Sequence, residues 1–365
     1  MRRLDYLHFV DRYFIKNYPV EITFFVTNRC NFRCKHCLNW QKIEDRKGRE
    51  LSISEIRQIS KTMKPFLRLL ISGGEPFLRE DLSEICKVFY ENCKIKHITI
   101  PTNGFLTSRI VEVTEQILRD CNNALVNVSL SLDGLYEKRD QICGVKGSFK
   151  KFEETYHELT ILKDKYPNLG VGVITTHTHD NQENLKEIFE YALNVLKVDN
   201  FGYSLVRGSL KYPIETKVDI NLYEEMAELI NNSVKEKKGK LNFPFFKMFL
   251  AKRALLYKTV IKTYKEKKWQ IPCYAGRLRA VFDEIGNVYP CETLMLDKKE
   301  QFSFGNFRDH NYDFNRIWFS KKASEIRKKI VTSKCFCRHE CDLTINILFN
   351  LRLLPTLIRE WIRIR

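Results

Sequence analysis

The sequence contains no hydrophobic run long enough to cross a membrane. A spanning helix needs about 20 consecutive apolar residues, and no segment of the 365 residues reaches that length. The N-terminal stretch MRRLDYLHFVDRYF begins with basic residues, but acidic and aromatic positions interrupt it before an apolar segment can build up, which excludes a secretory leader. These absences predict a cytoplasmic protein.

The sequence also lacks a low-complexity segment, a repeat of fixed period and a recognised nucleic-acid-binding module. Its net charge of +17 would suit nucleic acid, a membrane surface or an acidic substrate. Because no module accompanies the charge, we expect no nucleic acid partner. The hydrophobic fraction of 44% supports a sizeable core, and 365 residues suffice for one large domain or two smaller ones.

The twelve cysteines are the most informative residues. A reducing compartment disfavours disulfides, and clustered cysteines there usually hold metal or take part in catalysis. Two groups stand out: Cys30, Cys34 and Cys37, and then Cys273, Cys291, Cys335, Cys337 and Cys341. Of the scattered cysteines, Cys86, Cys93 and Cys121 are expected to be buried or half-buried thiols in helical surroundings.

Between residues 20 and 210, β-rich runs alternate with amphipathic helical stretches. The runs lie at 20–27, 66–74, 95–104, 127–134, 168–176 and 200–208. Six strands that alternate with helices predict parallel βαβ units. A closed eight-fold barrel takes about 250 residues, so we expect an α/β fold with a partial (β/α)6 TIM-type barrel and its active site in the loops after the strands. Ser52 and Glu55 predict a capping box at one of the helices.

The first cysteine group lies on the loop CNFRCKHC, after the first β-rich run. Thiolates are the ligands of iron–sulfur clusters, whereas structural zinc sites need four closed ligands. Three thiolates with no fourth cysteine before Cys86 suit a [4Fe–4S] cluster that leaves one iron open. The alternative is a zinc knuckle that takes a distant ligand such as His36.

The spacing Cys30-x3-Cys34-x2-Cys37, with SGGEP (residues 72–76) after the second β-rich run, resembles the signature of the radical S-adenosylmethionine (SAM) superfamily. The resemblance implies that these catalytic cysteines hold a [4Fe–4S] cluster whose open iron is chelated by SAM. It also implies cleavage of SAM to a 5′-deoxyadenosyl radical that removes a substrate hydrogen, and an electron donor such as flavodoxin or ferredoxin. Iron–sulfur potentials reach roughly −700 mV, the low end that such a reduction requires.

The same resemblance implies a set of SAM contacts near the strand ends. The glycines of SGGEP allow close backbone approach to the methionine part of SAM, and Glu75 accepts a hydrogen bond from its amino group. The implied SAM-binding residues are His36, Gly73, Gly74, Glu75, Pro76, Asn103, Ser131, Asp133, Thr175 and Leu205. For the single residues among them, the alternative is a capped turn or a packing role.

One segment departs from the family pattern. Related enzymes commonly carry Arg-Gly after the strand that ends in SLDG, and that arginine contacts the carboxylate of SAM. This chain has Cys143 at that position, in the stretch RDQICGVKGSF. Arg139, four residues earlier, is the nearest replacement for the arginine, and a role of Cys143 as a cluster ligand is a further alternative.

The second cysteine group resembles the auxiliary-cluster extension called SPASM, or its shorter relative, the twitch domain. Cys273 followed by Gly286-x4-Cys291 matches the opening of that pattern, but CFCRHEC supplies too few cysteines for two auxiliary clusters. The resemblance implies one auxiliary [4Fe–4S] cluster, held by four of the five cysteines, which accepts or relays an electron or ligates the substrate. A zinc ribbon made by the same thiols is the alternative.

These assignments divide the chain into five segments. They are an N-terminal extension (1–19), a radical SAM core (20–212), a basic helical region (213–269), a SPASM/twitch-like domain (270–342) and an amphipathic tail (343–365). In the tail, Leu357, Ile358, Trp361 and Ile362 form an apolar stripe beside arginines, a pattern typical of an interfacial helix at a membrane surface. A helix that packs on the barrel is the alternative, so the expected location is cytoplasmic, with or without peripheral membrane contact.

The substrate is predicted only by class. An extension of 19 residues is too short for a leader-binding domain, which favours a small-molecule or lipid-linked substrate. A peptide- or protein-modifying maturase, of the RiPP or sulfatase-maturase type, is the alternative enzyme. A non-catalytic iron–sulfur or zinc scaffold at the membrane belongs to another class, and the intact GGEP argues against it because a scaffold has no use for a SAM site.

Overall fold

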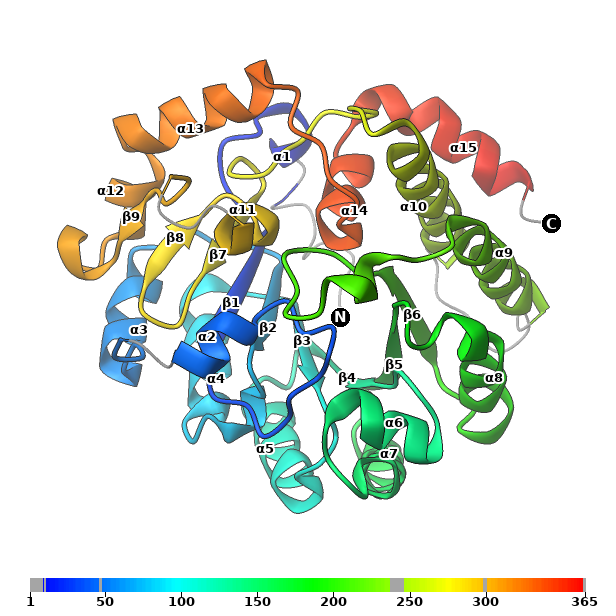
Figure 1. Ribbon diagram of the computed structural model, residues 1–365. Helices are drawn as coiled ribbons and strands as arrows, with labels where there is room; N and C mark the ends of the chain where they lie inside the picture. Colours follow the sequence, from blue (N-terminus) through cyan, green and yellow to red (C-terminus); the bar gives the residue numbers. More distant parts are fainter. Residues whose placement is uncertain (1–8, 10, 46–47, 237–245, 298–300, 364–365) are drawn as a thin grey trace.

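The computed structural model describes residues 9, 11–45, 48–236, 246–297 and 301–363. Its centre is a nine-stranded sheet with the order β6-β5-β4-β3-β2-β1-β7-β8-β9 (Figure 1). The first six strands are β1 (Glu21–Thr27), β2 (Arg68–Gly73), β3 (His97–Thr102), β4 (Leu125–Ser131), β5 (Leu169–His177) and β6 (Asn200–Leu205). Each pairs in parallel with the next, which confirms the six predicted strands and the partial barrel.

Helices connect successive strands and cover the outer face of the sheet (Figure 1). They are α2 (Trp40–Asp45), α3 (Ile53–Lys61), α4 (Leu82–Cys93), α5 (Thr107–Asp120), α6 (Tyr136–Cys143), α7 (Ser148–Lys165) and α8 (Leu185–Glu190), which continues as the π-helical turn Tyr191–Val195. In β2, β3 and β4, fully buried residues alternate with half-buried ones. The buried set, which includes Ile71, Ile100 and Val128, belongs to the main hydrophobic core. The half-buried set faces the interior of the barrel, because successive side chains of a strand point to opposite faces.

The sheet continues beyond β1, which was not predicted. β7 (Arg279–Phe282) pairs in parallel with β1, and β8 (Asn287–Tyr289) and β9 (Gly305–Asn306) extend that edge in antiparallel pairing. The prediction of six barrel strands was therefore incomplete, since seven parallel strands lie side by side. The chain after residue 270 contributes directly to the barrel sheet.

The remaining elements are mainly helical, and most of them follow β6. They are α1 (Asp11–Phe14), α9 (Ile220–Glu236), α10 (Phe246–Glu266), α11 (Glu292–Asp297), α12 (Phe314–Trp318), α13 (Lys321–Thr332), α14 (Glu340–Leu348) and α15 (Leu354–Arg363), with 3₁₀ turns at Pro76–Leu78, Gln182–Asn184, Pro213–Thr216, Arg308–His310 and Leu351–Leu353. Cys86, Cys93 and Cys121 are fully buried on or at the end of α4 and α5, as predicted.

Helix α14 lies across the open side of the barrel. The carboxylate of Glu340 accepts hydrogen bonds from the backbone N–H of Leu205, at the end of β6 (2.8 Å), and from the hydroxyl of Tyr223 on α9 (3.2 Å). At the other edge, the guanidinium of Arg279, at the start of β7, donates to the carboxylate of Asp342 (2.6 Å). All of these side chains are buried. Helix α14 therefore joins the two edges of the parallel sheet.

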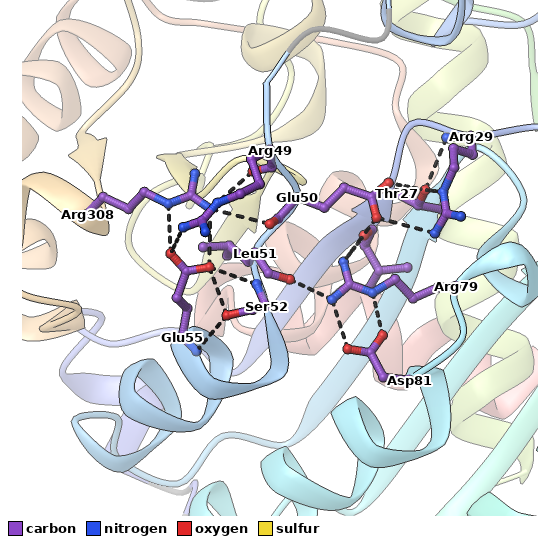
Figure 2. Close-up of polar contacts among 11 residues, drawn as sticks. Thr27, Arg29, Arg49, Glu50, Leu51, Ser52, Glu55, Arg79, Asp81 and Arg308 are labelled. Atoms are coloured by element: carbon purple, nitrogen blue, oxygen red, sulfur yellow. Dashed lines mark hydrogen bonds and ion pairs between the residues drawn. The ribbon is translucent and has the colours of Figure 1, made fainter.

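A polar network ties the loops after β1 and β2 to the C-terminal half of the chain (Figure 2). Ser52 and Glu55 form the predicted capping box at the start of α3. Burial opposes ionisation of Glu55, but hydrogen bonds from Arg308 and Ser52 lower its pKa to about 2. Arg79 donates to the backbone carbonyl of Val26 (2.9 Å) and so fixes the end of β1 against the segment before α4.

Helix α15 packs against α10 and keeps part of its apolar surface exposed. Leu357 is 3% exposed, whereas Ile358, Trp361 and Ile362 are 43%, 43% and 65% exposed. The predicted stripe is thus split between a packed and an exposed side. No single helix within the described residues is long and apolar enough to cross a membrane, although α14 and α15 together reach that length and composition with an 81° bend between them.

Candidate active site

The cysteines of the first group border one large cavity inside the barrel. Cys30, Cys34 and Cys37 are half-buried there, and the cavity has a volume of about 500 Å³. Residues from the ends of β2, β3 and β4 border the same cavity, namely Gly73, Gly74, Glu75, Asn103, Ser131 and Asp133. The two predicted motifs and most of the predicted SAM contacts therefore meet in one place.

Backbone hydrogen bonds fix the shape of the cysteine loop. The N–H groups of Arg33 and Lys35 donate to the carbonyls of Cys143 and Ile142, at 3.0 and 3.1 Å. Both carbonyls lie at the C-terminal end of α6, where carbonyl groups have no partner within the helix. The thiols of Cys143 and Cys34 are close enough to perturb each other, and Cys34 lowers the pKa of Cys143. The segment that departs from the family pattern is therefore a direct support of the cysteine loop.

Glycine is required where the SGGEP segment meets this loop. A Cβ atom added at Gly74 would lie 2.0 Å from the carbonyl oxygen of Arg29 and 3.1 Å from Cβ of Cys30. The preceding Gly73 has a φ angle of +130°, which side chains disfavour. The end of β2 can approach the cysteine loop this closely only because both positions are glycine.

Glu75 binds the neighbouring loops together. Its carboxylate accepts hydrogen bonds from the hydroxyl of Thr102 (2.9 Å) and from the backbone N–H groups of Asn103 (2.8 Å) and Phe77 (3.2 Å). Burial raises the pKa of Glu75 to about 7, although these hydrogen bonds oppose the shift. A carboxylate has about four acceptor positions, so three bonds leave one position for a further donor.

Arg139 is fully buried and lies in the cavity wall. Its Nη2 atom donates to the carbonyls of Asn103 (2.8 Å) and Ser131 (3.1 Å), so it links the ends of β3 and β4. The Nε and Nη1 atoms have no hydrogen-bond partner among the described residues. Arg139, the nearest replacement for the arginine of related enzymes, therefore lies in the cavity wall with two nitrogen atoms that have no partner among the described residues.

His36 and Asp133 face each other across the cavity rim. The Nε2 atom of His36 lies 3.3 Å from the carboxylate of Asp133, which also accepts a hydrogen bond from the backbone N–H of Thr176 (2.7 Å). Burial disfavours the charged imidazole, but Asp133 raises the pKa of His36 above its usual value. Both side chains are thereby held at the positions predicted for SAM contacts.

Three predicted SAM contacts do not border the cavity. Thr175 is fully buried and its hydroxyl donates to the carbonyl of Leu132 (2.7 Å), while Leu205 is part of the hydrophobic core. Their neighbours Thr176 and Val206 border the cavity instead, because adjacent residues of an extended chain face opposite sides. Pro76 is buried in the 3₁₀ turn that follows Glu75. Thr175 and Leu205 therefore lie one residue away from positions that border the cavity.

The second cysteine group divides between two cavities. Cys273, Cys291, Cys335 and Cys337 border a separate cavity of about 230 Å³, together with Asp342. Cys341 borders the barrel cavity. Among the described residues no three His, Cys, Asp or Glu side chains are already arranged as a metal-ion site, so it is the shared cavity that groups the four thiols. Four thiolates are the usual ligand set of one [4Fe–4S] cluster.

His339 borders the barrel cavity and contacts Asp342, which borders the smaller cavity. Its Nδ1 atom lies 2.7 Å from the carboxylate of Asp342, and its Nε2 atom lies 3.6 Å from that of Glu292. Burial and Arg207 disfavour the charged imidazole, but the two carboxylates raise the pKa of His339 to about 9. Burial opposes ionisation of the nearby Cys341 thiol, but His339 lowers its pKa.

The sequence did not reveal the part of the cavity wall that comes from the C-terminal half of the chain. Its charged and histidine side chains are Arg207, Lys252, Arg253, Glu292, His339 and Glu340, and Arg68 at the start of β2 borders the same cavity. Arg207 lies near the end of the last predicted β-rich run (200–208) and follows the observed β6, so its position at a strand end was a usable signal. Lys252 and Arg253 lie on α10, and nothing in their local sequence indicates the barrel.

The sequence matches the radical SAM superfamily over residues 24–198 and an iron–sulfur cluster-binding domain of the SPASM type over residues 273–342. An uncharacterized protein of Methanocaldococcus jannaschii is 28% identical over 295 residues, which are 78% of this chain and 88% of that protein. The PqqA peptide cyclase of Bradyrhizobium diazoefficiens is 24% identical over 84% of this chain and 74% of its own length. The GTP 3′,8-cyclase of Actinobacillus pleuropneumoniae is 29% identical, but the match covers only 37% of this chain and 42% of that enzyme.

Two solved structures have a similar fold. SuiB of Streptococcus suis gives a TM-score of 0.60 at 19% identity and covers 89% of this chain and 71% of its own. The structure of anSMEcpe with bound AdoMet and the Kp18Cys peptide gives 0.59 at 16% identity and covers 94% of this chain and 99% of its own.

The matched regions coincide with the two cysteine groups. The first region contains the cysteine loop and SGGEP, and the second contains all five later cysteines. The radical SAM domain brings a [4Fe–4S] cluster and SAM as cofactors, and the SPASM domain brings an auxiliary iron–sulfur cluster. An iron–sulfur cluster is therefore the cofactor at each cysteine group, and not the zinc of a knuckle at the first group or of a ribbon at the second. The chain belongs to the radical SAM superfamily, and it is an enzyme with a C-terminal SPASM domain.

Proposed function

We propose that the barrel cavity is the site of radical chemistry, with Cys30, Cys34 and Cys37 as the ligands of the SAM-binding [4Fe–4S] cluster. The observation that carries this proposal is that the cysteine loop and Gly73–Glu75 border one cavity and approach so closely that position 74 admits only glycine. With SAM bound, such a cluster supplies the electron that cleaves SAM to a 5′-deoxyadenosyl radical, which removes hydrogen from the substrate. A flavodoxin or ferredoxin would serve as the electron donor.

The chain's own residues then bind and orient SAM. The acceptor position left on Glu75 suits the amino group of SAM, because its other three hydrogen bonds hold the loop in place. Arg139 takes the carboxylate of SAM, for which its Nε and Nη1 donors are available. The other proposed SAM contacts are His36, Gly73, Gly74, Asn103, Ser131 and Asp133, with Pro76 shaping the turn.

Arg139 is the proposed replacement for the arginine that related enzymes carry at the position of Cys143. Arginine suits a carboxylate because its guanidinium stays charged and donates charge-assisted hydrogen bonds. Its guanidinium is already positioned by Asn103 and Ser131, two residues of the same proposed SAM site. Cys143 supports the cysteine loop through its carbonyl, and the three-cysteine site needs no fourth protein ligand when SAM completes it.

The auxiliary cluster is assigned to Cys273, Cys291, Cys335 and Cys337. These four thiols share the smaller cavity, whereas Cys341 borders the barrel interior. Asp342 borders the smaller cavity, and His339, which it orients, borders the larger one. This placement suits an auxiliary cluster that exchanges an electron with the substrate during a net oxidation.

The proposed substrate is a small or lipid-linked compound that enters the barrel cavity. Pockets of about 300–1,000 Å³ are typical for small ligands, and the cavity of about 500 Å³ falls within that range. Helix α14 closes the side of the barrel that a long chain would otherwise cross.

A peptide substrate is the second candidate, and the comparisons favour it. The PqqA peptide cyclase matches over 84% of this chain, and the similar structures include SuiB bound to its precursor peptide SuiA and anSMEcpe bound to a peptide. The GTP 3′,8-cyclases match a shorter part of the chain and represent a small-molecule chemistry.

The test is anaerobic reconstitution with iron, sulfide, SAM and dithionite, followed by measurement of 5′-deoxyadenosine. The wild type and Cys86→Ala, a buried cysteine of α4 outside the cavity, are expected to produce it. Cys34→Ala is expected to produce none. If the fully iron-loaded wild type forms no 5′-deoxyadenosine, with small-molecule and peptide candidates both supplied, the proposal fails.

A further inference from the structure

Two segments that are far apart in the sequence meet beside the smaller cavity. They are residues 262–270, at the end of α10 and just after it, and residues 327–338, from α13 to just before α14 (Figure 1). Both segments contribute residues to the cavity wall. The guanidinium of Arg338 also lies over the ring of Tyr264, 4.8 Å from its centre, and so joins the segments directly. The surface that they form therefore borders the thiols proposed to hold the auxiliary cluster.

The two segments are strongly basic. They contain nine lysine and arginine residues and a single carboxylate, that of Glu266. Two of the nine are engaged elsewhere, since Lys265 pairs with Glu224 of α9 at 2.6 Å and Arg327 donates to two backbone carbonyls. The carboxylate of Glu266 lies 3.1 Å from Lys268. The segments therefore retain a large excess of positive charge.

Two aromatic side chains are exposed among these cations. Trp269 is 39% exposed and Phe336 is 47% exposed. Aromatic residues are enriched at protein interfaces, where they supply much of the binding energy. Phe336 lies between Cys335 and Cys337, so its Cα atom is about 3.8 Å from that of each cysteine. A protein that covers Phe336 would therefore come within a few ångströms of the chain that carries two of the proposed cluster ligands.

Each exposed aromatic is flanked by two cations. Two lysines directly precede Trp269, while Lys334 and Arg338 lie two residues before and after Phe336. The three lysines are exposed and Arg338 is half-buried. Both aromatics lie on loops, whereas a membrane surface is usually met by the apolar face of an amphipathic helix. Apolar contacts within a positive field are complementary to an acidic protein surface, because the field steers such a partner into place.

We propose that this surface docks an acidic electron-carrier protein. The docking surface consists of Lys267, Lys268, Trp269, Lys334, Phe336 and Arg338. The inference rests on the proposed function, because a net oxidation of the substrate leaves one electron at the auxiliary site. The docked carrier, in its oxidised form, accepts that electron and is itself reduced by one electron, with no atom transferred. Encounters between redox proteins bury small interfaces and depend on charge, which suits two aromatics ringed by cations.

The first test maps where a carrier docks on the wild-type holoenzyme. An acidic flavodoxin is cross-linked to the enzyme with a carbodiimide, which joins carboxylates directly to amines, and the joined lysines are identified by mass spectrometry. We expect cross-links at Lys267, Lys268 and Lys334. Their yield is expected to fall about tenfold between 0.1 M and 1 M salt, because the Debye length falls from about 10 Å to about 3 Å. Cross-links confined to the surroundings of the cysteine loop, or a yield that salt does not change, would overturn the inference.

The second test is calorimetric binding of the same flavodoxin to Lys267→Glu/Lys334→Glu and to the matched control Lys150→Glu/Lys186→Glu. The control makes the same change of net charge at exposed lysines of α7 and α8, away from the docking surface (Figure 1). Charge reversal at the docking surface is expected to weaken binding at least tenfold, and the control is expected to stay within about threefold of the wild type. Circular dichroism and iron content verify that both variants are folded and loaded.

Three results separate this inference from its alternatives. Equal affinity of the two variants would overturn it, as would wild-type binding to anionic lipid vesicles or single-stranded RNA in place of flavodoxin. Flavodoxin binding without 5′-deoxyadenosine in the dithionite assay would refute the proposed function alone. 5′-Deoxyadenosine without flavodoxin binding would refute only the docking surface.

Discussion

The division of the second cysteine group predicts how iron content responds to single substitutions. If all five thiols shared one site, loss of Cys291 and loss of Cys341 would lower the iron content alike. The structure places these two cysteines in different cavities. Cys291→Ser removes one of four thiols around the smaller cavity. Cys341→Ser changes a thiol that borders the barrel cavity. The two variants make the same chemical change at positions 50 residues apart.

The expected iron content of each variant follows from the number of thiols that remain at each cluster site. Two [4Fe–4S] clusters correspond to about eight irons per chain. Cys291→Ser leaves three thiols at the auxiliary site and is expected to retain about four irons, all at the SAM-binding cluster. Cys341→Ser leaves all four auxiliary thiols and is expected to retain about eight. The triple change of Cys30, Cys34 and Cys37 to Ala is expected to leave about four, now at the auxiliary site.

Iron and acid-labile sulfide are measured after anaerobic reconstitution, with Mössbauer spectra to verify that the iron is present as [4Fe–4S]. Cys121→Ser, a buried core cysteine, controls for loss of iron through general destabilisation. A fall to about four irons in Cys341→Ser, with full loading of Cys335→Ser or Cys337→Ser, would refute the assignment. It would mean that α14 supplies a cluster ligand and that the two cavities do not separate the thiols.

Four further predictions concern other parts of the molecule. Arg139→Met is expected to weaken SAM binding by about tenfold, ~1.4 kcal/mol, with iron content unchanged. Gly74→Ala is expected to prevent loading of the SAM-binding cluster, because its Cβ would lie 2.0 Å from the carbonyl oxygen of Arg29. Glu55→Gln is expected to lower the free energy of unfolding by about 1 kcal/mol at pH 7. Because the folded-state pKa of Glu55 is depressed to about 2, this stabilisation is fully present above about pH 4.5, the usual pKa of glutamate, and is lost as the pH falls toward 2. Deletion of residues 351–365 is expected to abolish flotation with anionic liposomes if the exposed side of α15 binds membrane.

Each of these has a result that would contradict it. Unchanged SAM affinity in Arg139→Met, measured by equilibrium dialysis, would show that another group holds the carboxylate. Normal iron loading of Gly74→Ala would mean that the loop can move aside. A difference between wild type and Glu55→Gln that persists in urea titrations near pH 2 would disprove the ionic origin of its stabilisation. No flotation of the full-length chain would leave packing against α10 as the role of α15.

The local parts of the structure were predictable from sequence. The six strands, the capping box at Ser52 and Glu55 and the convergence of Cys30 with Gly74 follow from periodicity, cap chemistry and the rule that loops after parallel strands meet at one face. β7 escaped notice because it is only four residues long and buried on both faces, so it shows no alternation. The sequence did not indicate that Thr176, and not its neighbour Thr175, borders the cavity, because a shift of one residue moves a side chain to the opposite face of a strand.

The remaining features depend on distant parts of the chain. The spacing of the last five cysteines does not reveal that Cys341, in the first turn of α14, borders the barrel cavity while Cys337 borders the smaller one. Nor does the sequence around Lys252 show that α10 borders the same cavity as Arg68, since that depends on how helices after residue 213 return to the barrel. Such contacts between distant segments are set by packing, which local patterns do not encode.

Helix α14 has a consequence for how the enzyme matures. Its hydrogen bonds to β6 and β7 close the barrel, yet it follows directly after the cysteines assigned to the auxiliary cluster. Helix α14 therefore completes a barrel whose first strand lies some 300 residues earlier in the chain. Metal insertion at Cys335 and Cys337 would anchor that helix, so filling of the auxiliary site and closure of the barrel become one cooperative folding step. Iron starvation would then yield a chain with an open barrel, a target for proteolysis before any radical could form.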